Sequence, residues 1–487
     1  MTNELLSTIK PQAIWQHFMA LNAVPRPSKK EERVIAFMKS FGERHNLETL
    51  VDAIGNVIIK KPATTGMEDR RAVVLQSHLD MVHQKNDNTD FDFDNQGIEM
   101  YVDEGWVRAR GTTLGADNGL GVAAMMAVLS ADDLAHPDLE ALFTIDEETG
   151  MTGAMKLSPA TLNGRILLNL DTEEDDEIGI GCAGGVDVTA TKSYSPEISP
   201  AGSECFQISV SGLQGGHSGM DIHRGLGNAN KILNRFLSGL VLEHGVSLRS
   251  VDGGGLRNAI PREAKAVVVI PSNKHDDFTD YFSQLRNAIQ TEYKSLEPNI
   301  KLELAPAEPV KEILPNAVAE ALVHTLRAVN NGVYRMSPEF DNLVETSNNL
   351  AKVVAKEGQI TVLCLTRSSV LSTRVDLASA LQSVFESNGF SVEFSGEYPG
   401  WAPDMDSPIL QTLTEKYVEL FQSQPQVAAC HAGLECGIIG QHYPDMDMIS
   451  FGPTIRSAHS PDERAEIRSV EKFWKFLKAV LADIPKK

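Results

Sequence analysis

The sequence has no long apolar run, few cysteines, and fewer basic than acidic residues. No apolar run reaches the ~20 residues that span a bilayer, so we expect no transmembrane helix. The N-terminal segment MTNELLSTIKPQ has no basic region followed by a long apolar stretch. We therefore expect no signal peptide.

The five cysteines are scattered along the chain and show no paired metal-binding spacing. They are Cys182, Cys205, Cys364, Cys430 and Cys436. An odd, dispersed set argues against a disulfide framework and fits a reducing compartment. The cysteine pattern therefore predicts a cytoplasmic protein.

Basic residues number 44 against 66 acidic ones, which gives a formal net charge of −22. Such a surface repels phosphate backbones, which argues against nucleic acid and anionic membranes as partners. Part of the acidic excess is expected on the solvated surface. The rest is available to gather around cations, and the motifs below indicate where.

The length of 487 residues predicts two domains, because a single core rarely grows beyond ~250–300 residues. Residues 11–20 and 29–46 have helical patterns, the second with Ser28 as its cap. Short apolar strands follow and alternate with helices, notably the helix at 119–130. This pattern is typical of a largely parallel sheet covered on both faces.

After about residue 186 the strands alternate apolar and polar residues, as half-exposed antiparallel strands do. Beyond about 397 a helix, a strand and a closing helix would complete the first domain. The predicted fold is α/β, with a catalytic domain split between 1–186 and 397–487 and an α+β domain inserted at 187–396. We expect no tandem repeat.

The stretch LQSHLDMVHQ ends an apolar strand in His78 and Asp80. Residues two apart in an extended segment point the same way, so Asp80 can hold one ring nitrogen while the other faces a metal. The alternative is a surface histidine beside a surface aspartate. In TTLGADNGLG, Asp117 precedes an apolar helix, and the alternative there is an N-cap.

Acidic residues also follow other strands. Asp146, Glu147 and Glu148 follow an apolar strand in LFTIDEETG, where three carboxylates repel one another unless a cation is present. The alternative is an acidic loop. His459 lies in a loop after the strand MDMISFG, and an ordinary loop histidine is the alternative.

With Asp171 of NLDTEED, five potential ligands end four strands of one predicted domain: His78, Asp117, Glu148, Asp171 and His459. Open α/β sheets place their sites beyond the carboxyl ends of the strands. Five nitrogen and oxygen ligands with one bridging carboxylate suit two zinc ions ~3.5–4 Å apart. No cysteine is among them, which argues against a structural zinc site.

The motifs SHLD, GADNG, DEETGM, NLD, GGHSG and SAHSPDE occur in one order along nearly the whole chain. In this the sequence resembles the co-catalytic zinc peptidases, a family that includes aminoacylases, desuccinylases, carboxypeptidases and tripeptidases. Within that family it resembles the bacterial dipeptidases that cleave Xaa-His. The resemblance implies a zinc-peptidase catalytic domain with a mostly parallel sheet and an inserted α+β lid domain that also makes dimer contacts.

The resemblance also implies roles for the motif residues. One zinc would be bound by His78 and Asp171, the other by Glu148 and His459, and Asp117 would bridge them. The peptide bond between Asp117 and Asn118 would be cis. Asp80 would orient His78, and Glu147 would act as general base on a zinc-activated water. Cobalt or manganese are acceptable substitutes for the two zinc ions per subunit.

In the inserted domain, the resemblance implies that His217 stabilises the oxyanion. Asn258, Arg367 and Gly433 would hold the substrate, with Arg367 on its free carboxylate. Because the insert is nearly twice as long as that of shorter relatives, the sequence leaves open whether His217 acts in its own subunit or across a dimer. It assigns no role to Asp221 or His223, and leaves a contact of Glu435 with the substrate amine as an open option.

The predicted function is a cytoplasmic, homodimeric metallo-dipeptidase acting on β-alanyl-histidine, other Xaa-His and further unblocked dipeptides. An N-acyl amino acid deacylase with the same core is the alternative enzyme. A catalytically silent scaffold would lack a ligand or the base, and the sequence retains all five ligands and Glu147.

Overall fold

A computed structural model describes residues 6, 8–86 and 88–487. The chain divides into two compact units. Unit 1 comprises the described residues up to Gly181, Trp401–Ala429 and Leu434–Lys487, and unit 2 comprises Cys182–Gly400 and Cys430–Gly433. The short return to unit 2 at Cys430–Gly433 was not predicted.

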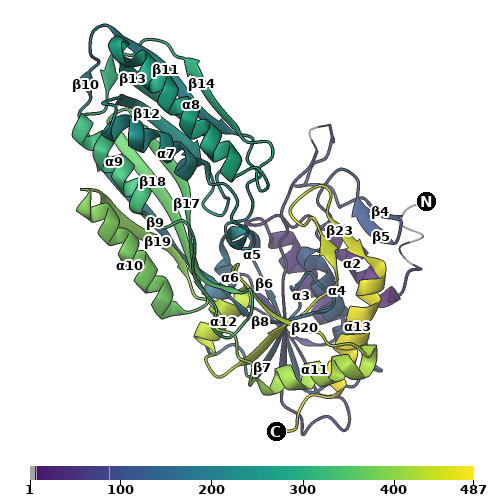
Figure 1. The fold of residues 1–487 in the computed structure, drawn as a ribbon. Helices are drawn as coiled ribbons and strands as arrows, with labels where there is room; N and C mark the ends of the chain where they lie inside the picture. Colours follow the sequence, from purple (N-terminus) through teal and green to yellow (C-terminus); the bar gives the residue numbers. More distant parts are fainter. Residues whose placement is uncertain (1–5, 7, 87) are drawn as a thin grey trace. The chain divides into compact units, whose positions relative to one another are not determined.

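Unit 1 is built on an eight-stranded sheet (Figure 1). In spatial order its strands are β1 (Glu48–Val51), β2 (Val57–Lys61), β6 (Leu139–Thr144), β3 (Val73–His78), β7 (Ile166–Asn169), β21 (Asp447–Ser450), β8 (Glu177–Cys182) and β20 (Gln426–Cys430). The four central strands, from β6 to β21, are mutually parallel. Every residue of β6, β3 and β7 is buried, as expected for parallel strands covered on both faces.

The prediction of a mostly parallel sheet is right for these central strands and wrong toward both edges. β1 pairs with β2, β2 with β6, and β21 with β8, all antiparallel. At the first edge the cause is local, because Asp52 accepts hydrogen bonds from the backbone N–H groups of Ile54, Gly55 and Asn56. This turn closes β1 and β2 into a hairpin, which only antiparallel strands can form.

Helices surround this sheet (Figure 1). They are α2 (Gln12–Asn22), α3 (Glu32–Arg44), α4 (Ala116–Ser130), α5 (Glu147–Gly150), α6 (Thr152–Met155), α11 (Pro408–Phe421), α12 (Glu435–His442) and α13 (Ile467–Ala482). α4 is apolar on all sides and buried almost throughout, against α2 and β3. The predicted Ser28 cap of α3 is wrong: the helix begins after Glu31, and the Ser28 hydroxyl instead donates to Asp80.

A small antiparallel sheet in unit 1 was not predicted. It contains β22 (Ile455–Arg456), β23 (Arg464–Glu466), β5 (Trp106–Ala109) and β4 (Met100–Asp103), in that order. The loop that joins β22 to β23 carries His459. This sheet therefore anchors both ends of a loop that belongs to the candidate site.

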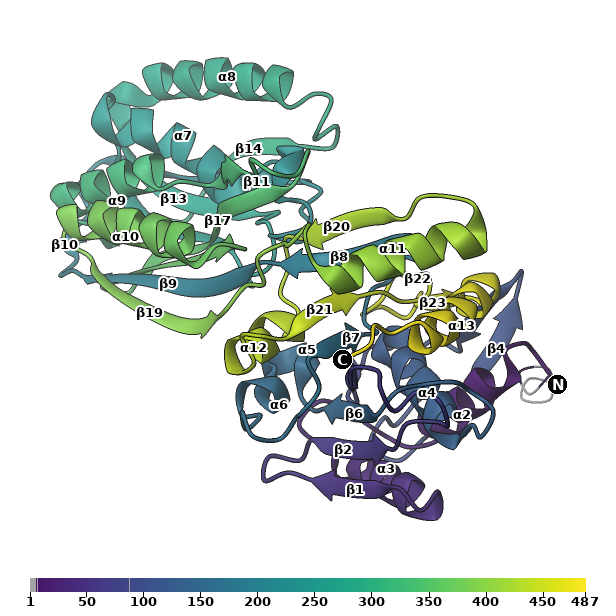
Figure 2. The ribbon, with the colours of Figure 1, turned by 90° about the horizontal axis from the view of Figure 1, so that it is seen from below.

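Unit 2 contains a nine-stranded antiparallel sheet (Figure 2). Its main path is β14 (Lys301–Pro306), β11 (Ser203–Ser211), β13 (Ala264–Pro271), β12 (Ser247–Gly254), β17 (Val344–Lys356), β18 (Gln359–Ser368), β9 (Gly184–Ser193) and β19 (Ser391–Tyr398), with β16 (Gly332–Met336) on β17. Its helices are α7 (Ala229–Leu242), α8 (His275–Glu292), α9 (Asn316–Ala328) and α10 (Leu371–Ser387). Two short strands, β10 (Glu197–Ile198) and β15 (Glu312–Ile313), pair separately, and 3₁₀ turns cover Ile222–Arg224 and Ser272–Lys274.

Unit 2 repeats one topology twice. The elements β11, α7, β12, β13, α8 and β14 form one βαββαβ module, and β9, α9, β17, β18, α10 and β19 form another. The first module is inserted in the chain after β9 of the second, and β12 pairs with β17 to join them. This repeat of element order was missed because the two modules share a pattern of elements and not a residue motif.

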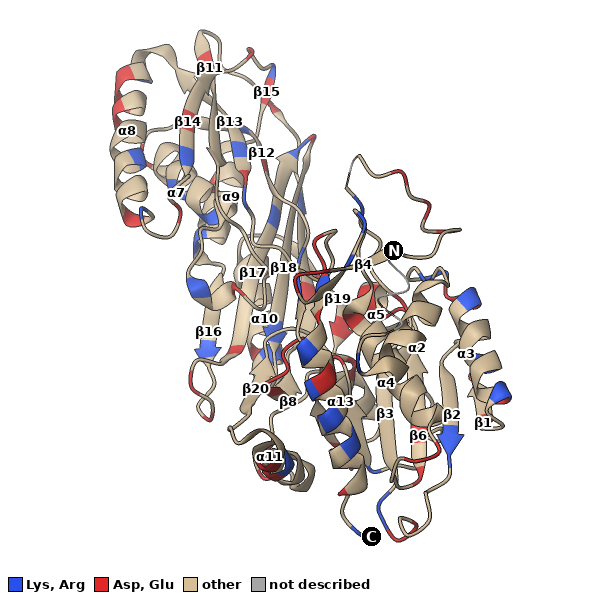
Figure 3. Cartoon of the chain, turned by 90° about the vertical axis from the view of Figure 1, so that its right-hand side faces the viewer, with Lys and Arg blue, Asp and Glu red and all other residues tan. Residues whose placement is uncertain are grey.

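The remaining general expectations concern membrane spans, thiols and charge. Among the helices that the structure describes, none has the length and hydropathy needed to cross a bilayer. No disulfide bond joins any of the five cysteines, all of which lie in the described part of the chain. Figure 3 marks Asp and Glu positions in red on the ribbon of both units, along α8 as well as in the loops around α5.

Candidate metal centre

The predicted ligands lie where the central strands of unit 1 end. His78 is the last residue of β3, Asp171 follows β7, and Glu148 lies in α5, which follows β6. Asp117 is in the first turn of α4, and His459 lies between β22 and β23. Because β6, β3 and β7 are parallel, their carboxyl ends meet at one edge of the sheet.

The carboxylate of Asp117 divides the site into two groups. Its Oδ1 lies 3.2 Å from Nε2 of His78, and the same nitrogen lies 3.6 Å from Oδ1 of Asp171. Its Oδ2 lies 3.1 Å from Nε2 of His459, which is 2.9 Å from Oε2 of Glu148. Each oxygen of one carboxylate thus faces its own histidine and its own second carboxylate, the arrangement expected for a pair of bridged cations.

The electrostatics of the site favour bound cations. Burial raises the pKa of Asp171 to about 6. Hydrogen bonds to Asp117 and Glu148 raise the pKa of His459 to about 11. Burial opposes charge on His78, yet Asp171 and Asp117 raise its pKa well above the usual value. The carboxylates therefore draw protons onto both imidazoles, where a divalent cation would satisfy the same charges.

One buried atom supports this interpretation directly. Oε1 of Glu148 is buried and has no hydrogen-bond partner among the described residues. An orphaned carboxylate oxygen is unfavourable unless something not made of protein binds it. Two imidazoles and three carboxylates form a mixed nitrogen and oxygen donor set that suits zinc, whereas calcium and magnesium take oxygen ligands.

Asp80 connects His78 to the acidic turn. Its Oδ1 lies 3.4 Å from Nδ1 of His78 and accepts a hydrogen bond from the backbone N–H of Glu147 at 3.1 Å. Its Oδ2 accepts from the backbone N–H of Glu148 at 3.2 Å and from the Ser28 hydroxyl at 2.7 Å. Asp80 is fully buried and its backbone carbonyl lies 3.1 Å from Nδ1 of His78, so this one residue fixes both the histidine ring and the start of α5.

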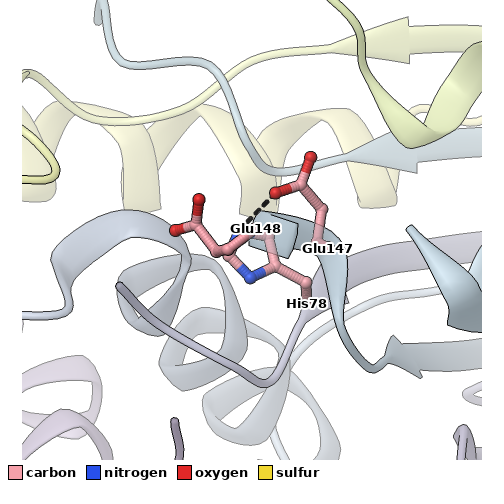
Figure 4. A group of neighbouring side chains, drawn as sticks. All are labelled: His78, Glu147 and Glu148. Atoms are coloured by element: carbon pink, nitrogen blue, oxygen red, sulfur yellow. Dashed lines mark ion pairs between the residues drawn. The ribbon is translucent and has the colours of Figure 1, made fainter. Parts of the chain in front are cut away.

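Glu147 lies beside the predicted ligands but belongs to neither of the two groups that face the carboxylate of Asp117. Its Oε2 is 3.9 Å from Nε2 of His78, and Figure 4 shows the two side chains facing each other with Glu148 alongside. Burial raises its pKa well above the usual value, and the neighbouring charges of Asp171 and Glu148 add to this. A carboxylate with a raised pKa is suited to take a proton near neutral pH.

Two residues that hold the site were missed by the sequence interpretation. Glu463 is buried and accepts hydrogen bonds from the backbone N–H groups of Leu114, Gly115, Ala116 and Asp117. Arg26 is buried and donates to the carbonyls of Leu79, Asp80 and Gly115. Glu463 ends the quoted motif SAHSPDE but was given no role there, and Arg26 lies between two prolines, a pattern without diagnostic spacing.

The structure does not support the alternative that Asp117 is the N-cap of α4. The N-cap of α4 is Gly115, with φ of 68°, and no side chain of the helix caps its N-terminus. Both oxygens of Asp117 face histidines, and the backbone N–H groups of Ala116 and Asp117 donate to Glu463. The Asp117–Asn118 peptide bond is cis, which confirms that expectation.

The remaining predicted residues lie in unit 2. The backbone N–H of Ser218, next to His217, donates to the carbonyl of Asn258 at 2.8 Å. Nε of Arg367, on β18, lies 3.4 Å from the hydroxyl of Ser218. Unit 2 thus gathers the segments that carry His217, Asn258 and Arg367. Gly433 belongs to the short return segment of the same unit.

The ring of His217 is held in one tautomer. Its Nδ1 accepts hydrogen bonds from the backbone N–H groups of Gly219 and Met220, at 3.2 and 3.1 Å. This leaves the proton of the neutral ring on Nε2. Asp221 accepts from the backbone N–H of His217 and from Arg224, which makes it a support of the loop.

Glu435 is the first residue of α12 in unit 1. Its Oε2 accepts hydrogen bonds from Gln76 at 2.7 Å and from Thr144 at 2.6 Å. Burial raises its pKa to about 8. The side chain of Glu435 therefore contacts polar residues of β3 and β6 that closely precede the metal-centre residues in the sequence.

Comparison with known proteins places this geometry in a family. Residues 74–483 match peptidase family M20/M25/M40. The chain is 42% identical over 482 residues to the cytosol non-specific dipeptidase of Escherichia coli (strain K12), covering 99% of both chains. It is 44% identical to the crystal structure of aminoacylhistidine dipeptidase from Vibrio alginolyticus, with a TM-score of 0.90 over 99% of this chain and 98% of that one.

A more distant structure shares the fold alone. A tripeptidase from Staphylococcus aureus subsp. aureus Mu50 gives a TM-score of 0.57 at 15% identity, covering 98% of this chain and 99% of that one. The close sequence match over the whole chain and the family match over the motifs agree with the shared carboxylate site of unit 1. The chain belongs to peptidase family M20/M25/M40.

Proposed function

We propose that this peptide hydrolase is a metal-dependent dipeptidase that cleaves Xaa-His dipeptides, β-alanyl-histidine among them, and other unblocked dipeptides. The observation that carries the proposal is the Asp117 carboxylate shared between two histidine–carboxylate groups, with Glu147 beside them. The two most similar relatives described above are both named dipeptidases, which supports the same substrate class.

The residues present fit two zinc ions per subunit, with cobalt or manganese as substitutes. His78 and Asp171 would hold one cation, Glu148 and His459 the other, and Asp117 would bridge them. When bound, such a pair supplies a water that is acidic near neutral pH and a Lewis acid for a carbonyl oxygen.

The chain's own side chains would move the protons. Glu147 takes a proton from the attacking water and gives it to the leaving amine, because its carboxylate has a raised pKa and lies beside the ligands. Asp80 keeps Glu147 in place through the backbone N–H bond at 3.1 Å. His217, with its proton on Nε2, donates to the developing oxyanion.

Substrate binding falls to residues of unit 2. Asn258 and Gly433 contact the substrate, and Arg367 binds its free carboxylate through a two-pronged guanidinium contact. Unit 2, which corresponds to the predicted insert at 187–396, acts as a lid. We also propose a homodimer, on the family resemblance. Cytoplasmic localisation is proposed from the cysteine pattern and from the name of the Escherichia coli relative.

The experiment removes the metal, adds zinc back, and compares hydrolysis of a dipeptide with hydrolysis of N-acetyl amino acids. Protein stripped with a chelator should lose hydrolysis of β-alanyl-histidine and regain it with zinc. Hydrolysis retained by metal-free protein would contradict the proposed metal dependence. N-acetyl amino acids, tested alongside, should be poor substrates, and a preference for them would make the protein a deacylase instead.

A second arm separates the base from the ligands. Glu147→Gln should retain zinc but lose about two to four orders of magnitude in turnover, because a general base contributes that much. Glu148→Gln, one residue along, should lose zinc as well. If Glu147→Gln turned over dipeptides at the wild-type rate, the assignment of the base would be wrong.

A further inference from the structure

Arg367 is a buried cation without an anion. It is 5% exposed and forms no ion pair among the described residues, because the nearby carboxylate of Asp187 is paired with Arg257 at 3.0 Å. Its contacts are neutral: Nη1 donates to the Tyr398 hydroxyl at 2.6 Å, and Nε lies 3.4 Å from the Ser218 hydroxyl. Burying a guanidinium without an ion pair is unfavourable. Since its contacts are with neutral hydroxyl groups, the side chain is suited to bind an anion from outside the protein.

The contact with Tyr398 depends on the strand register. Arg367 on β18 lies opposite Gly185 on β9, and Tyr398 on β19 lies opposite the same glycine. The three strands are neighbours in the sheet (Figure 1). Arg367 and Tyr398 are therefore two strands apart in one row, with Gly185 between them.

Gly185 leaves the space through which Tyr398 reaches Arg367. A Cβ atom at this position would lie 2.6 Å from the hydroxyl oxygen and from Cζ of Tyr398. Real Cβ contacts are never this short, so the tyrosine ring lies directly over the glycine. The row is thus built for this one hydrogen bond, with a glycine where any side chain would block it.

The other side of Arg367 adds no competing charge. Ser347 on β17 lies opposite Arg367, and its hydroxyl is hydrogen-bonded to Nε2 of the buried His431 at 2.7 Å. Burial and the nearby charge of Arg367 lower the pKa of His431 to about 3, so this imidazole is neutral at neutral pH. Arg367 is then the single positive charge in this row.

We propose that Tyr398 is a positioning residue for Arg367, and that Gly185 is required for it. The Tyr398 hydroxyl accepts from one arm of the guanidinium and turns its plane, so that the other N–H groups meet the free C-terminal carboxylate of the substrate. This positioning role rests on the proposed function. It extends that function, because the free carboxylate becomes the substrate group by which the protein selects unblocked dipeptides. The phenol neither touches the substrate nor takes part in the chemistry.

Tyr398→Phe tests this role because it removes only the hydroxyl. We expect KM for an unblocked dipeptide to rise about tenfold with kcat nearly unchanged, since a hydrogen bond to a charged group is lost. The corresponding dipeptide amide has no carboxylate, so its kcat/KM should stay the same. The ratio of the two kcat/KM values should therefore fall about tenfold.

Tyr194→Phe is the matched control. Tyr194 also lies in unit 2, and its buried hydroxyl has no hydrogen-bond partner among the described residues. This variant should leave the dipeptide-to-amide ratio unchanged. Gly185→Ala, checked for folding by its urea unfolding midpoint, should lower the ratio at least as much as Tyr398→Phe, because the methyl group displaces the ring.

The possible outcomes distinguish a failure of the positioning role of Tyr398 from a failure of the proposed dipeptidase function. A wild-type protein that hydrolyses no dipeptide contradicts the proposed function. A wild-type dipeptidase whose Tyr398→Phe variant keeps its ratio, or loses activity equally on dipeptide and amide, contradicts only the positioning role. If the amide is not turned over, competitive inhibition by the free product amino acid decides: its inhibition constant should rise about tenfold in Tyr398→Phe, and an unchanged constant overturns the proposal.

Discussion

Glu463 accepts a hydrogen bond from the backbone N–H of Asp117 at 3.2 Å, across 346 positions of sequence. The same carboxylate binds the three preceding amides, at 2.6 to 2.9 Å. Glu463 follows His459 by four residues, so the loop that carries one predicted ligand also holds the backbone of the bridging one. The two halves of the site in unit 1 are thereby joined through a residue that binds no metal.

The first prediction concerns this contact. In Glu463→Gln, an amide NH₂ would replace one oxygen and face the backbone N–H groups, so two acceptor contacts become repulsive. We expect zinc affinity to fall about tenfold to a hundredfold, the usual effect of losing a residue that orients a ligand. Competition with a chromophoric chelator measures it. Asp462→Asn, the exposed neighbouring acid, is the control, and equal affinities in the two variants would contradict the role of Glu463.

The second prediction concerns Asp80. Its two oxygens accept the backbone N–H groups of Glu147 and Glu148, and one of them faces His78. Asp80→Asn places an NH₂ group against one of these backbone N–H groups, so the base loses its orientation, and the histidine ring keeps only its contact with the Asp80 carbonyl. We expect kcat to fall about tenfold to a hundredfold at saturating zinc. Ser28→Ala removes only the hydroxyl on Oδ2 and should have a much smaller effect.

The clustering of the candidate metal-centre residues could be predicted from the sequence because their positions follow from a general rule. Parallel strands of a sheet end at one edge, so His78 at the end of β3 and Asp171 after β7 must come close together. His459 needed the family resemblance as well. Its loop reaches the site through the small sheet of β22, β23, β5 and β4, whose strands are too short to be predicted from periodicity.

The supporting residues could not be predicted, for a physical reason. Glu463 and Arg26 bind backbone amides and carbonyls, so their partners impose no residue type, and even within the motif SAHSPDE nothing marked the role of Glu463. Tyr398 is paired with Arg367 through a strand register that only the folded sheet defines. The two modules of unit 2 share element order, which an inserted segment after β9 conceals in the linear sequence.

The third prediction concerns stability and metal. The metal-free site holds Asp117, Glu148 and Asp171 together in a buried place, where their charges repel one another. A cation that binds only the folded state stabilises it, by about 2.7 kcal/mol at a hundredfold excess over Kd. We expect the thermal midpoint of the stripped protein to rise steadily with zinc concentration. A midpoint independent of zinc would show that these carboxylates do not bind it.

The fourth prediction concerns pH and His17, which lies on α2 away from the metal centre. Its Nε2 is hydrogen-bonded to Ser130 at 3.1 Å, and its ring packs edge-on against Phe41. Burial lowers its pKa to about 4, and the nearby His45 adds to the effect. The folded chain therefore keeps this ring neutral in a pH range where the unfolded chain, with a pKa of about 6.5, binds a proton.

The sign of the effect follows from proton binding. Between pH 6.5 and about 4 the unfolded state binds more protons at His17, so the free energy of unfolding falls as the pH is lowered through this window. Its contribution is fully present above pH 6.5. At pH 5 the loss amounts to up to about 2 kcal/mol for a shift of this size.

Urea unfolding at pH 7 and pH 5 measures this contribution. The wild-type protein should lose more stability between the two pH values than His17→Gln, because glutamine does not titrate. Both proteins are compared at the same saturating zinc concentration, so that loss of metal at low pH affects them alike. His324→Gln, exposed on α9, should keep the wild-type difference. If His17→Gln also kept it, proton uptake at His17 would have no part in the acid sensitivity of the fold.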